Sequence, residues 1–248
     1  MRILIAPAKK MKEATDDFVY RSLPVFLSEA QELRHWLLSL SHEERKKLWA
    51  CSEKIALNAE KYLQRDLQQG MSPALLAYDG IQYTTMEPSL FDEEEFDYLR
   101  QHLRILSGFY GALKPFDGII PYRLEMQTKG APEGKDLYAW WGEKIYEEVR
   151  DGDGIFLDLA SEEYSKAVSP YLKKEDRCIR ILFAEEEEGK LSTKGVYAKI
   201  ARGDSVRWLA EHRTTDPEEF KAYDRLGYRY VPEISDDEHW YFVRNIKL

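Results

Sequence analysis

Basic residues recur beside turns and helix starts in this sequence, and such placement suits the binding of phosphate groups. Lys9 directly follows a short apolar run. Lys54 and Asn58 are four residues apart, and Lys199 and Arg202 are three apart, so each pair lies on one face of a predicted helix. Low-dielectric walls around several such cations would strengthen their field. The pattern therefore predicts a concave anion-binding site.

Residues 92–126 are the stretch around which we expect this site to form. Asp92 and Glu95 predict a capping box that opens an amphipathic helix. Gly108 and Gly111 then enclose a tight turn, and Arg123 lies at its exit. A helix, a glycine turn and a basic exit can offer backbone N–H groups to a phosphate. In the alternative interpretation the turn only connects two helices, and the glycines serve its geometry.

The full set of candidates combines these glycines with the scattered cations. Lys135 precedes a predicted helix cap, and Lys166 lies on a predicted helix directly after a strand. Each cation alone is typical of a solvated surface, so the hypothesis depends on their convergence in one cleft. The candidate DNA- or anion-binding residues are Lys9, Lys54, Asn58, Gly108, Gly111, Arg123, Lys135, Lys166, Lys199 and Arg202.

Motifs for other common chemistries are absent from the sequence. It contains no GxSxG nucleophile elbow, no GxGxxG and no GxxxxGK[ST] phosphate loop. Its five histidines never occur as HxH or HxxxH, and its two cysteines, Cys51 and Cys178, form no CxxC pair. We expect two reduced thiols, no metal site and no cofactor.

Composition indicates a soluble globular protein. The 248 residues are 44% hydrophobic and 33% charged, with a formal net charge of −9. That charge argues against a uniformly basic coat for nucleic acid but allows a local basic cleft. The apolar N-terminus is too short for a signal peptide, and no stretch approaches the ~18 apolar residues of a membrane span. We expect a cytoplasmic monomer without membrane association.

The pattern of elements predicts an α/β (mixed α+β) fold: one domain, residues 1–248, with a mixed sheet flanked by helices and a helix-hairpin-helix-like element. Short apolar runs predict strands at 3–6, 74–78, 155–159, 178–183, 227–231 and 239–244. The first and third of these are expected to be parallel, and the last two to form an antiparallel hairpin. Helices are predicted at 28–40, 41–48, 52–64, 92–106, 136–149, 161–168 and 197–213, the last with some interruption at Gly203.

Several short motifs, in the same order over nearly the whole chain, resemble those of the YaaA peroxide-stress protein family. They include APAK at 6–9, SEKI at 52–55, AYDG at 77–80, LSGFYG at 106–111, PYRLEM at 121–126, GKDLY at 134–138, LASEEYSK at 159–166 and YAKIARG at 197–203. The glycine spacing at 108–111 is one residue longer than the GxG of a common helix-hairpin-helix turn.

The resemblance implies a cytoplasmic protein that takes part in the defence against hydrogen peroxide, in part through lower free intracellular iron. It also implies binding of double-stranded DNA through a basic cleft and a helix-hairpin-helix element, on an unusual α/β fold. The first hypothesis is thus a DNA-binding protein of the peroxide stress response.

A second hypothesis, an enzyme of lyase or glycosylase type that acts on a nucleic acid or nucleotide in the same cleft, stays open. Such an enzyme needs a carboxylate or a lysine beside a base-sized pocket. Asp136, Glu125, Glu162 and Lys166 are its candidates, although the sequence pairs none of them. Direct iron binding is not supported, because the sequence contains neither a His/Cys cluster nor a clear ferritin-like pair of ExxH motifs.

Overall fold

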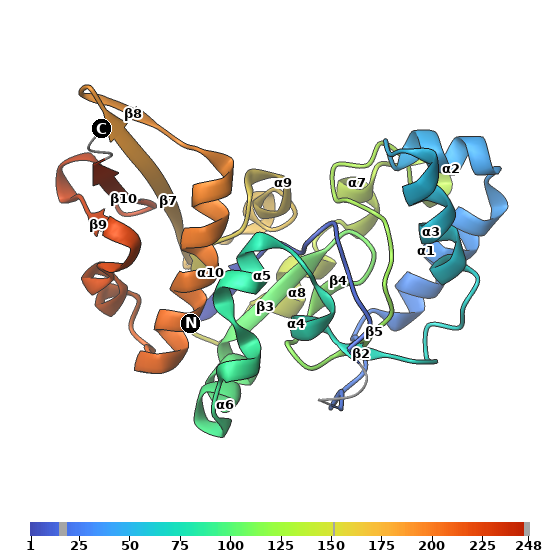
Figure 1. The fold of residues 1–248 in the computed structure, drawn as a ribbon, viewed down its shortest axis with the longest axis horizontal. Coiled ribbons are helices and arrows are strands. Elements are labelled where there is room, and N and C mark those ends of the chain that lie inside the picture. The colour runs from blue at the N-terminus through green and yellow to red at the C-terminus, as the bar shows by residue number, and fades with distance from the viewer. Residues whose placement is uncertain (15–18, 151, 246–248) are drawn as a thin grey trace.

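A mixed β-sheet forms the centre of the computed structural model, which describes residues 1–14, 19–150 and 152–245 (Figure 1). Its strands lie in the order β4-β3-β1-β6-β7-β10-β9, with β8 paired to β7. The inner strands are parallel, and β4, β8 and β9 are antiparallel to their neighbours. The bounds are β1 Arg2–Ile5, β3 Leu103–Ser107, β4 Gly111–Leu113, β6 Ile155–Asp158, β7 Arg177–Glu187, β8 Lys190–Ser192, β9 Arg229–Tyr230 and β10 His239–Asn245. A small second sheet pairs β2 Ser72–Pro73 with β5 Gly118–Ile119.

Helices surround the sheet, and three of them, α1 to α3, gather at the end of the molecule opposite β7 to β10 (Figure 1). The longest helix, α10, packs against α5, α6 and β7. The α-helices are α1 Leu27–Ser39, α2 His42–Leu48, α3 Glu53–Leu63, α4 Ala74–Ala77, α5 Ile81–Met86, α6 Glu93–His102, α7 Leu137–Trp141, α8 Lys144–Val149, α9 Glu162–Ser165 and α10 Gly195–His212. Short 3-10 turns lie at Pro88–Leu90, Pro132–Gly134, Ser169–Tyr171, Pro217–Ala222, Arg225–Gly227 and Pro232–Ile234.

The mixed α/β fold predicted from the sequence is confirmed. β1 and β6 are parallel neighbours, with Ile3 opposite Leu157, as the two apolar runs predict. β9 and β10 form the predicted antiparallel pair, with Phe242 opposite Tyr230. Parallel strands of this kind are buried on both faces, which is why their sequences are nearly continuous apolar runs.

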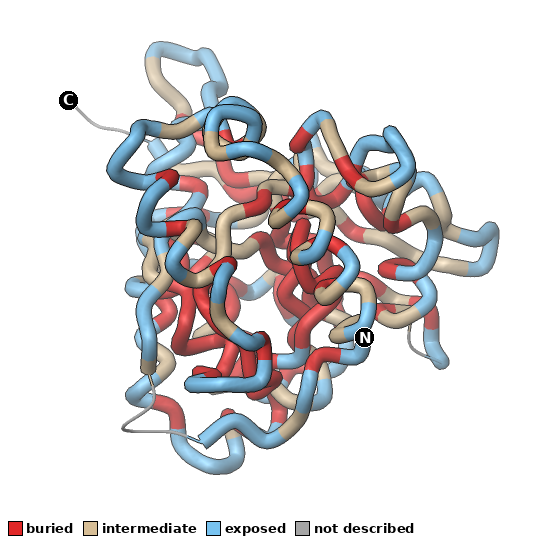
Figure 2. The backbone as a smooth tube through the Cα atoms, turned by 90° about the vertical axis from the view of Figure 1, so that its right-hand side faces the viewer, coloured by how far each residue is buried: buried red, intermediate tan, exposed pale blue. Residues whose placement is uncertain are grey.

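The buried residues form one connected core that extends from Met1 to Phe242 (Figure 2). It includes the buried strand residues Ile3 and Leu157 and the helix residues Leu99 and Leu209, each with no exposed surface. The expectation of one domain over residues 1–248 is consistent with this core and stays a prediction.

The helix predicted through Leu106 is wrong in its second half. The Asp92–Glu95 capping box does open α6, but the helix ends at His102. Leu103–Ser107 is instead a fully buried strand beside β1. A short apolar run that is buried on every side has no periodicity to distinguish a strand from a helix. The Gly108–Gly111 turn therefore joins the antiparallel strands β3 and β4, and no helix-hairpin-helix element forms there.

Two other predictions are wrong for local reasons. The apolar run at 74–78 contains the single helical turn α4, not a strand, and all four of its residues are buried. The helix predicted over 136–149 is divided into α7 and α8 at Gly142, whose φ of 53° suits glycine and ends α7.

The glycine within α10 has a packing role. We expected an interruption of the helix at Gly203, but α10 continues through it to His212. A Cβ at Gly203 would overlap the backbone carbonyl oxygen of Gln82 in α5. Glycine at this position therefore lets the two helices approach closely, and this approach places Gln82 beside the candidate site described below.

We expect Gly203→Ala to destabilise the fold by about 2 kcal/mol or more, because overpacking against backbone forces the helices apart. Gly195→Ala, at the start of the same helix, is the matched control, since a Cβ there meets no atom within 4 Å. Urea denaturation of both variants measures the difference. Equal stability of the two variants would contradict the close packing of α5 and α10.

Candidate functional site

Three adjoining cavities meet at Arg123, which lines all of them. The inner pocket, about 360 Å³, is lined by residues 6–10, 79–83 and 122–125 with Ser161, Glu163, Tyr164, Lys199 and Arg202. The basic groove, about 780 Å³, is lined by residues 9–11, 54–55, 57–59, 61–62 and 121–123. The side groove, about 530 Å³, is lined by residues 44, 47–50, 123, 125 and 127–129.

Tyr122 anchors the segment that carries Arg123. Its hydroxyl shares hydrogen bonds with the Tyr78 hydroxyl (2.8 Å) and the Ser107 Oγ (2.7 Å), and its ring stacks on Phe109 at a centroid distance of 5.1 Å. Burial raises the pKa of Tyr122 to about 12, so the phenol stays neutral. Because the side chain is fixed on the core, the next residue must emerge at the junction of the cavities.

Gly108 packs directly against the backbone of the same segment. A Cβ on this residue would lie 2.7 Å from the Leu124 carbonyl oxygen and 3.0 Å from the Met126 nitrogen. The backbone N–H groups of Phe109 and Tyr110 donate to the Ser107 Oγ (3.2 and 2.9 Å). The turn between β3 and β4 is therefore the buried base on which residues 124–126 rest.

An ion-pair chain connects this segment to the loop after β1. Glu125 forms ion pairs with Lys9, at 2.6 Å from its Nζ, and with Arg123, at 2.7 Å from its Nη2. Lys9 remains 63% exposed, whereas Arg123 is 14% exposed and Glu125 17%. The arginine Nε is buried without a hydrogen-bond partner among the described residues. One carboxylate is thus shared by two cations, which leaves positive charge at the junction.

The loop after β1 is held along its length. Lys12 N donates to Ala77 O and Asp79 N donates to Lys10 O, both at 2.8 Å. The side chains of Lys10 and Asp79 form an ion pair of 2.5 Å. The tyrosine of α5, Tyr83, donates its hydroxyl to a carbonyl oxygen at the end of β1 (2.9 Å). These contacts position the lysines of the loop at the edges of two cavities.

Helix α3 forms the other wall of the basic groove. Lys54, Asn58 and Lys61 are spaced at i, i+4 and i+7, so they form one stripe along the helix, and all three are exposed. In the described part of the chain, neither lysine of this stripe has an ion-pair partner. Ile55 and Leu57 also line the groove and are 44% and 48% exposed. The groove thus combines unpaired cations with apolar wall surface.

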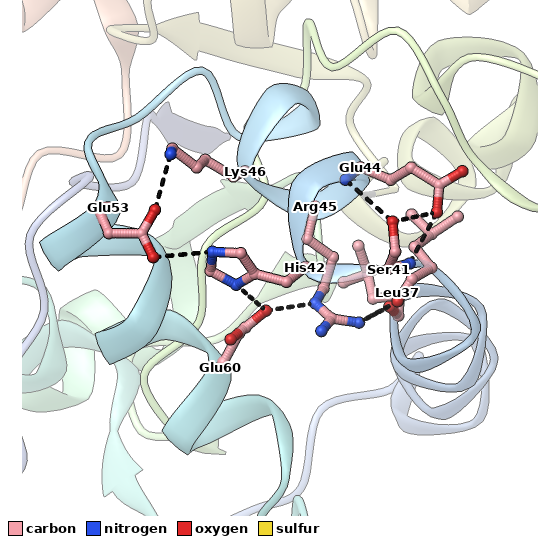
Figure 3. Close-up of polar contacts among 9 residues, drawn as sticks. Leu37, Ser41, His42, Glu44, Arg45, Lys46, Glu53 and Glu60 are labelled. Atoms are coloured by element: carbon pink, nitrogen blue, oxygen red, sulfur yellow. Dashed lines mark hydrogen bonds and ion pairs between the residues drawn. The ribbon is translucent and has the colours of Figure 1, made fainter.

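A network of charged residues fixes α3 to α2 (Figure 3). His42 Nδ1 lies 3.0 Å from Glu60, and His42 Nε2 lies 2.9 Å from Glu53. Arg45 Nε donates to the same Glu60 oxygen (2.7 Å), and Lys46 pairs with Glu53 (2.7 Å). An imidazole can donate from both nitrogens only when it is protonated. The network therefore favours the charged histidine.

The inner pocket is bounded on its far side by α10. Lys199 and Arg202 line the pocket from one face of this helix. Asp158 at the end of β6 is buried, accepts from Ser165 Oγ at 2.5 Å and from Ala160 N at 2.9 Å, and attracts the guanidinium of Arg202. Burial lowers the pKa of Arg202, while Asp158 opposes this effect. A buried carboxylate thus lies within electrostatic range of the arginine.

Carboxylates also reach the inner pocket. Glu163 is half-buried beside Glu125, and it accepts a hydrogen bond from Gln127 N (3.2 Å). Burial raises the pKa of Glu163, and the charge of Glu125 adds to this effect. The pocket therefore contains carboxylates, cations and the rings of Tyr83 and Tyr164, whereas the described residues that line the basic groove include no carboxylate.

Comparison with known proteins identifies the family. A family model described as "Peroxide stress protein YaaA" matches residues 1–234. The chain belongs to the YaaA peroxide stress protein family. It is 47% identical over 246 residues to a UPF0246 protein of Desulfitobacterium hafniense (strain Y51), which covers 98% of each chain. UPF0246 proteins of Agathobacter rectalis (45%, 99% of this chain and 100% of the relative) and Limosilactobacillus reuteri (44%, 98% of each) are similar over the same length.

Six of the ten candidate residues in this YaaA family member line the cavities. Lys9 and Arg123 line both the inner pocket and the basic groove, Lys54 and Asn58 line the groove, and Lys199 and Arg202 line the pocket. The predicted cations thus gather around two connected cavities rather than one.

The other four candidates lie elsewhere. Lys135 pairs with Glu133 (2.7 Å) and Lys166 with Glu162 (2.8 Å), and neither lysine lines these cavities. Gly108 and Gly111 are buried; the second packs against the Trp141 ring with a φ of 71°. Their turn therefore has no surface for a phosphate, which corrects the prediction of a phosphate-facing turn.

Of the enzyme candidates, only Glu125 lines the inner pocket. Asp136 caps α7 by accepting from Ala139 N (2.8 Å), and Glu162 pairs with Lys166. Among the described residues, no group of three or more His, Cys, Asp or Glu side chains is arranged to hold a metal ion. No helix in this part of the chain is both long and apolar enough to span a membrane.

Sequence reasoning missed Lys61, Gln82 and Glu163. Lys61 could have been found, because it follows Lys54 by seven residues on the same helix face. Gln82 and Glu163 gave no such signal, since their place in the pocket depends on how α5 and α9 pack.

The stability of the α2–α3 pair should depend on pH through His42. The hydrogen bond that His42 donates to Glu60 raises the pKa of His42 above the ordinary value of 6.5, and Glu53 adds to this effect. A raised pKa in the folded state gives stabilisation that is complete below about pH 6.5 and is lost as pH rises through the folded-state pKa. We expect the Tm difference between the wild type and His42→Gln to be larger at pH 5.5 than at pH 8.5.

The matched control is His35→Gln, an exposed histidine of α1 with no hydrogen-bond or ion-pair partner among the described residues. Its Tm difference from the wild type should be small at both pH values. A pH-independent difference for His42→Gln would contradict the proposed charge network.

Proposed function

We propose that this YaaA family member binds double-stranded DNA in the basic groove as its part in the peroxide stress response. The observation that supports this most strongly is the composition of the groove: its lining includes Lys9, Lys10, Lys54, Lys61 and Arg123, and no carboxylate among the described residues. Phosphates bind such surfaces through the release of counterions. The groove is local, which reconciles it with the net charge of −9.

The division of charge within the groove suggests how a duplex backbone is bound. Glu125 and Asp79 already neutralise part of the charge of Lys9, Arg123 and Lys10. The lysines of α3 have no such partner in the described ranges of the chain, so no neighbouring carboxylate there reduces their attraction for phosphate. We assign the main phosphate contacts to Lys54 and Lys61, with Arg123 at the end of the groove.

The helix-hairpin-helix role that the family implies falls, in this proposal, to α2 and α3. The two helices are joined by residues 49–52, where Ala50 has a φ of 44°. A capping box of Ser41 and Glu44 opens α2, and the His42 network holds it against α3 (Figure 3). Lys47 lines the side groove on one side of this pair, and Lys54 lines the basic groove on the other.

Duplex binding should therefore depend steeply on salt and on the α3 lysines. We expect Lys54→Gln and Lys61→Gln each to weaken binding about 3- to 10-fold at low salt and to reduce the slope of log K against log [salt] by about 1. Fluorescence anisotropy with a labelled duplex of mixed sequence measures both quantities.

The control is Lys166→Gln, which removes a lysine outside the grooves and should leave affinity and slope unchanged. Wild-type affinity that does not depend on salt, or no duplex binding at low salt, would sink the proposal.

An enzyme acting on nucleic acid in the same place is the alternative, and Glu163 is the observation that favours it. Burial raises the pKa of its carboxyl, which is the direction that a general acid requires. Under the main proposal, we expect DNA with unpaired or damaged bases to remain intact after incubation with the wild type. Release of a base or cleavage of a strand, lost in Glu163→Gln, would establish the alternative instead.

Cytoplasmic location, a monomeric state and an effect on free intracellular iron stay predictions from the sequence and its family. The groove offers a direct physical basis for DNA binding only.

A further inference from the structure

The inner pocket is connected to the basic groove through Lys9, Lys10, Tyr122 and Arg123, which line both cavities. A polynucleotide backbone in the groove would therefore pass directly beside the mouth of the pocket. At about 360 Å³, the pocket is within the range of small-ligand sites and is far too small for a duplex. What fits is a single unit of the polymer.

The walls near the mouth suit a flat, polar ring. The side chains of Tyr83, Tyr122 and Tyr164 are buried among the core, and apolar surface comes from Pro7 and Ile81. Aromatic side chains and apolar surface are the usual partners of an unstacked nucleobase. The hydroxyls of Tyr83 and Tyr122 are already hydrogen-bonded within the protein, so these residues contribute chiefly apolar ring surface.

Gln82 supplies the unused polar group. It is 7% exposed and lines the pocket, and its Nε2 has no hydrogen-bond partner in the described part of the chain. Leaving a buried donor unsatisfied costs about 1–3 kcal/mol. A primary amide can both donate to and accept from the edge of a nucleobase. The packing of Gly203 against the Gln82 backbone holds this group in place.

Cations lie at the other end of the pocket. Lys199 and Arg202 line it from α10, and the buried Asp158 interacts electrostatically with Arg202. The Arg202 Nε is also buried without a hydrogen-bond partner among the described residues. An aromatic wall, a free amide and two cations match the three parts of a nucleotide: its ring face, its ring edge and its phosphate.

We propose that the inner pocket binds one nucleotide unit, supplied by an unpaired position of DNA that lies in the basic groove. This inference rests on the proposed function for the source of the nucleotide, but the pocket chemistry applies equally to a free nucleotide. An unpaired position is required because extrusion of a paired base costs several kcal/mol more in unpairing and unstacking.

The test uses a duplex with one unpaired 2-aminopurine, whose emission rises when it leaves the base stack. At saturating protein we expect the emission to rise about two-fold or more, with no such rise for the same base in a fully paired duplex. Anisotropy of a second label on the same DNA reports binding independently.

Two pocket variants and one groove variant give the contrast. Gln82→Leu and Lys199→Gln should each abolish the rise at saturation, and the exposed position of Lys199 keeps the test valid if the buried substitution fails to fold. Lys54→Gln should weaken DNA binding in the anisotropy titration, but the emission should still rise as much as with the wild type once the DNA is saturated. Free dAMP should suppress the rise while the duplex stays bound.

Failure takes two distinguishable forms. If DNA binds with unchanged emission, or if both pocket variants show the full rise, the proposal that the inner pocket binds a nucleotide is refuted. The proposed function is then still supported. If the duplex does not bind at all, the proposed function fails, and calorimetry with dAMP alone then tests nucleotide binding in the pocket. Binding of dAMP that Gln82→Leu abolishes supports the pocket proposal. No binding of dAMP refutes it.

Discussion

The geometry of the candidate site depends on the hydroxyl of Tyr122. Hydrogen bonds to Tyr78 and Ser107 fix the phenol, and stacking on Phe109 fixes the plane of its ring. Because the next residue in the chain is Arg123, this anchor determines where the three cavities meet. A neutral phenol whose pKa is about 12 keeps the same hydrogen bonds at any physiological pH, so the junction does not depend on titration.

Around that junction, pairing with carboxylates divides the cations into two kinds. Arg123 and Lys9 share Glu125, so these two cations are oriented by a common carboxylate. The α3 lysines line the groove without such partners among the residues that the structure describes. Oriented cations suit the recognition of a single ligand, whereas free lysines suit a mobile polymer of phosphates. The same protein surface thus combines oriented cations, which can position a ligand, with unpaired lysines, which attract a phosphate backbone.

The sequence predicted the mixed sheet, the capping box of α6 and most of the cavity-lining cations. The capping box of Asp92 and Glu95 could be predicted because cap chemistry is local. Lys54 and Asn58 were readable because helical spacing places them on one face.

What the sequence could not predict depends on contacts between distant segments. Leu103–Ser107 looked helical because a strand buried on both faces has no alternation, and only its pairing with β1 distinguishes it. Gly108 looked like a ligand-binding glycine, but it is buried beneath residues 124–126. Gln82 enters the pocket only because α5 packs on Gly203, which follows Gln82 by 121 residues in the sequence.

The central claim is that the DNA backbone lies along α3 in the basic groove, with Arg123 at the end of the groove. Photocrosslinking tests this claim most directly. A duplex carrying 4-thiothymidine, irradiated in complex with the protein and mapped by mass spectrometry, should form adducts within residues 54–62 and 121–123 that are lost at high salt. Adducts confined to the surface of β7 to β10, at the opposite end of the molecule, would contradict the account.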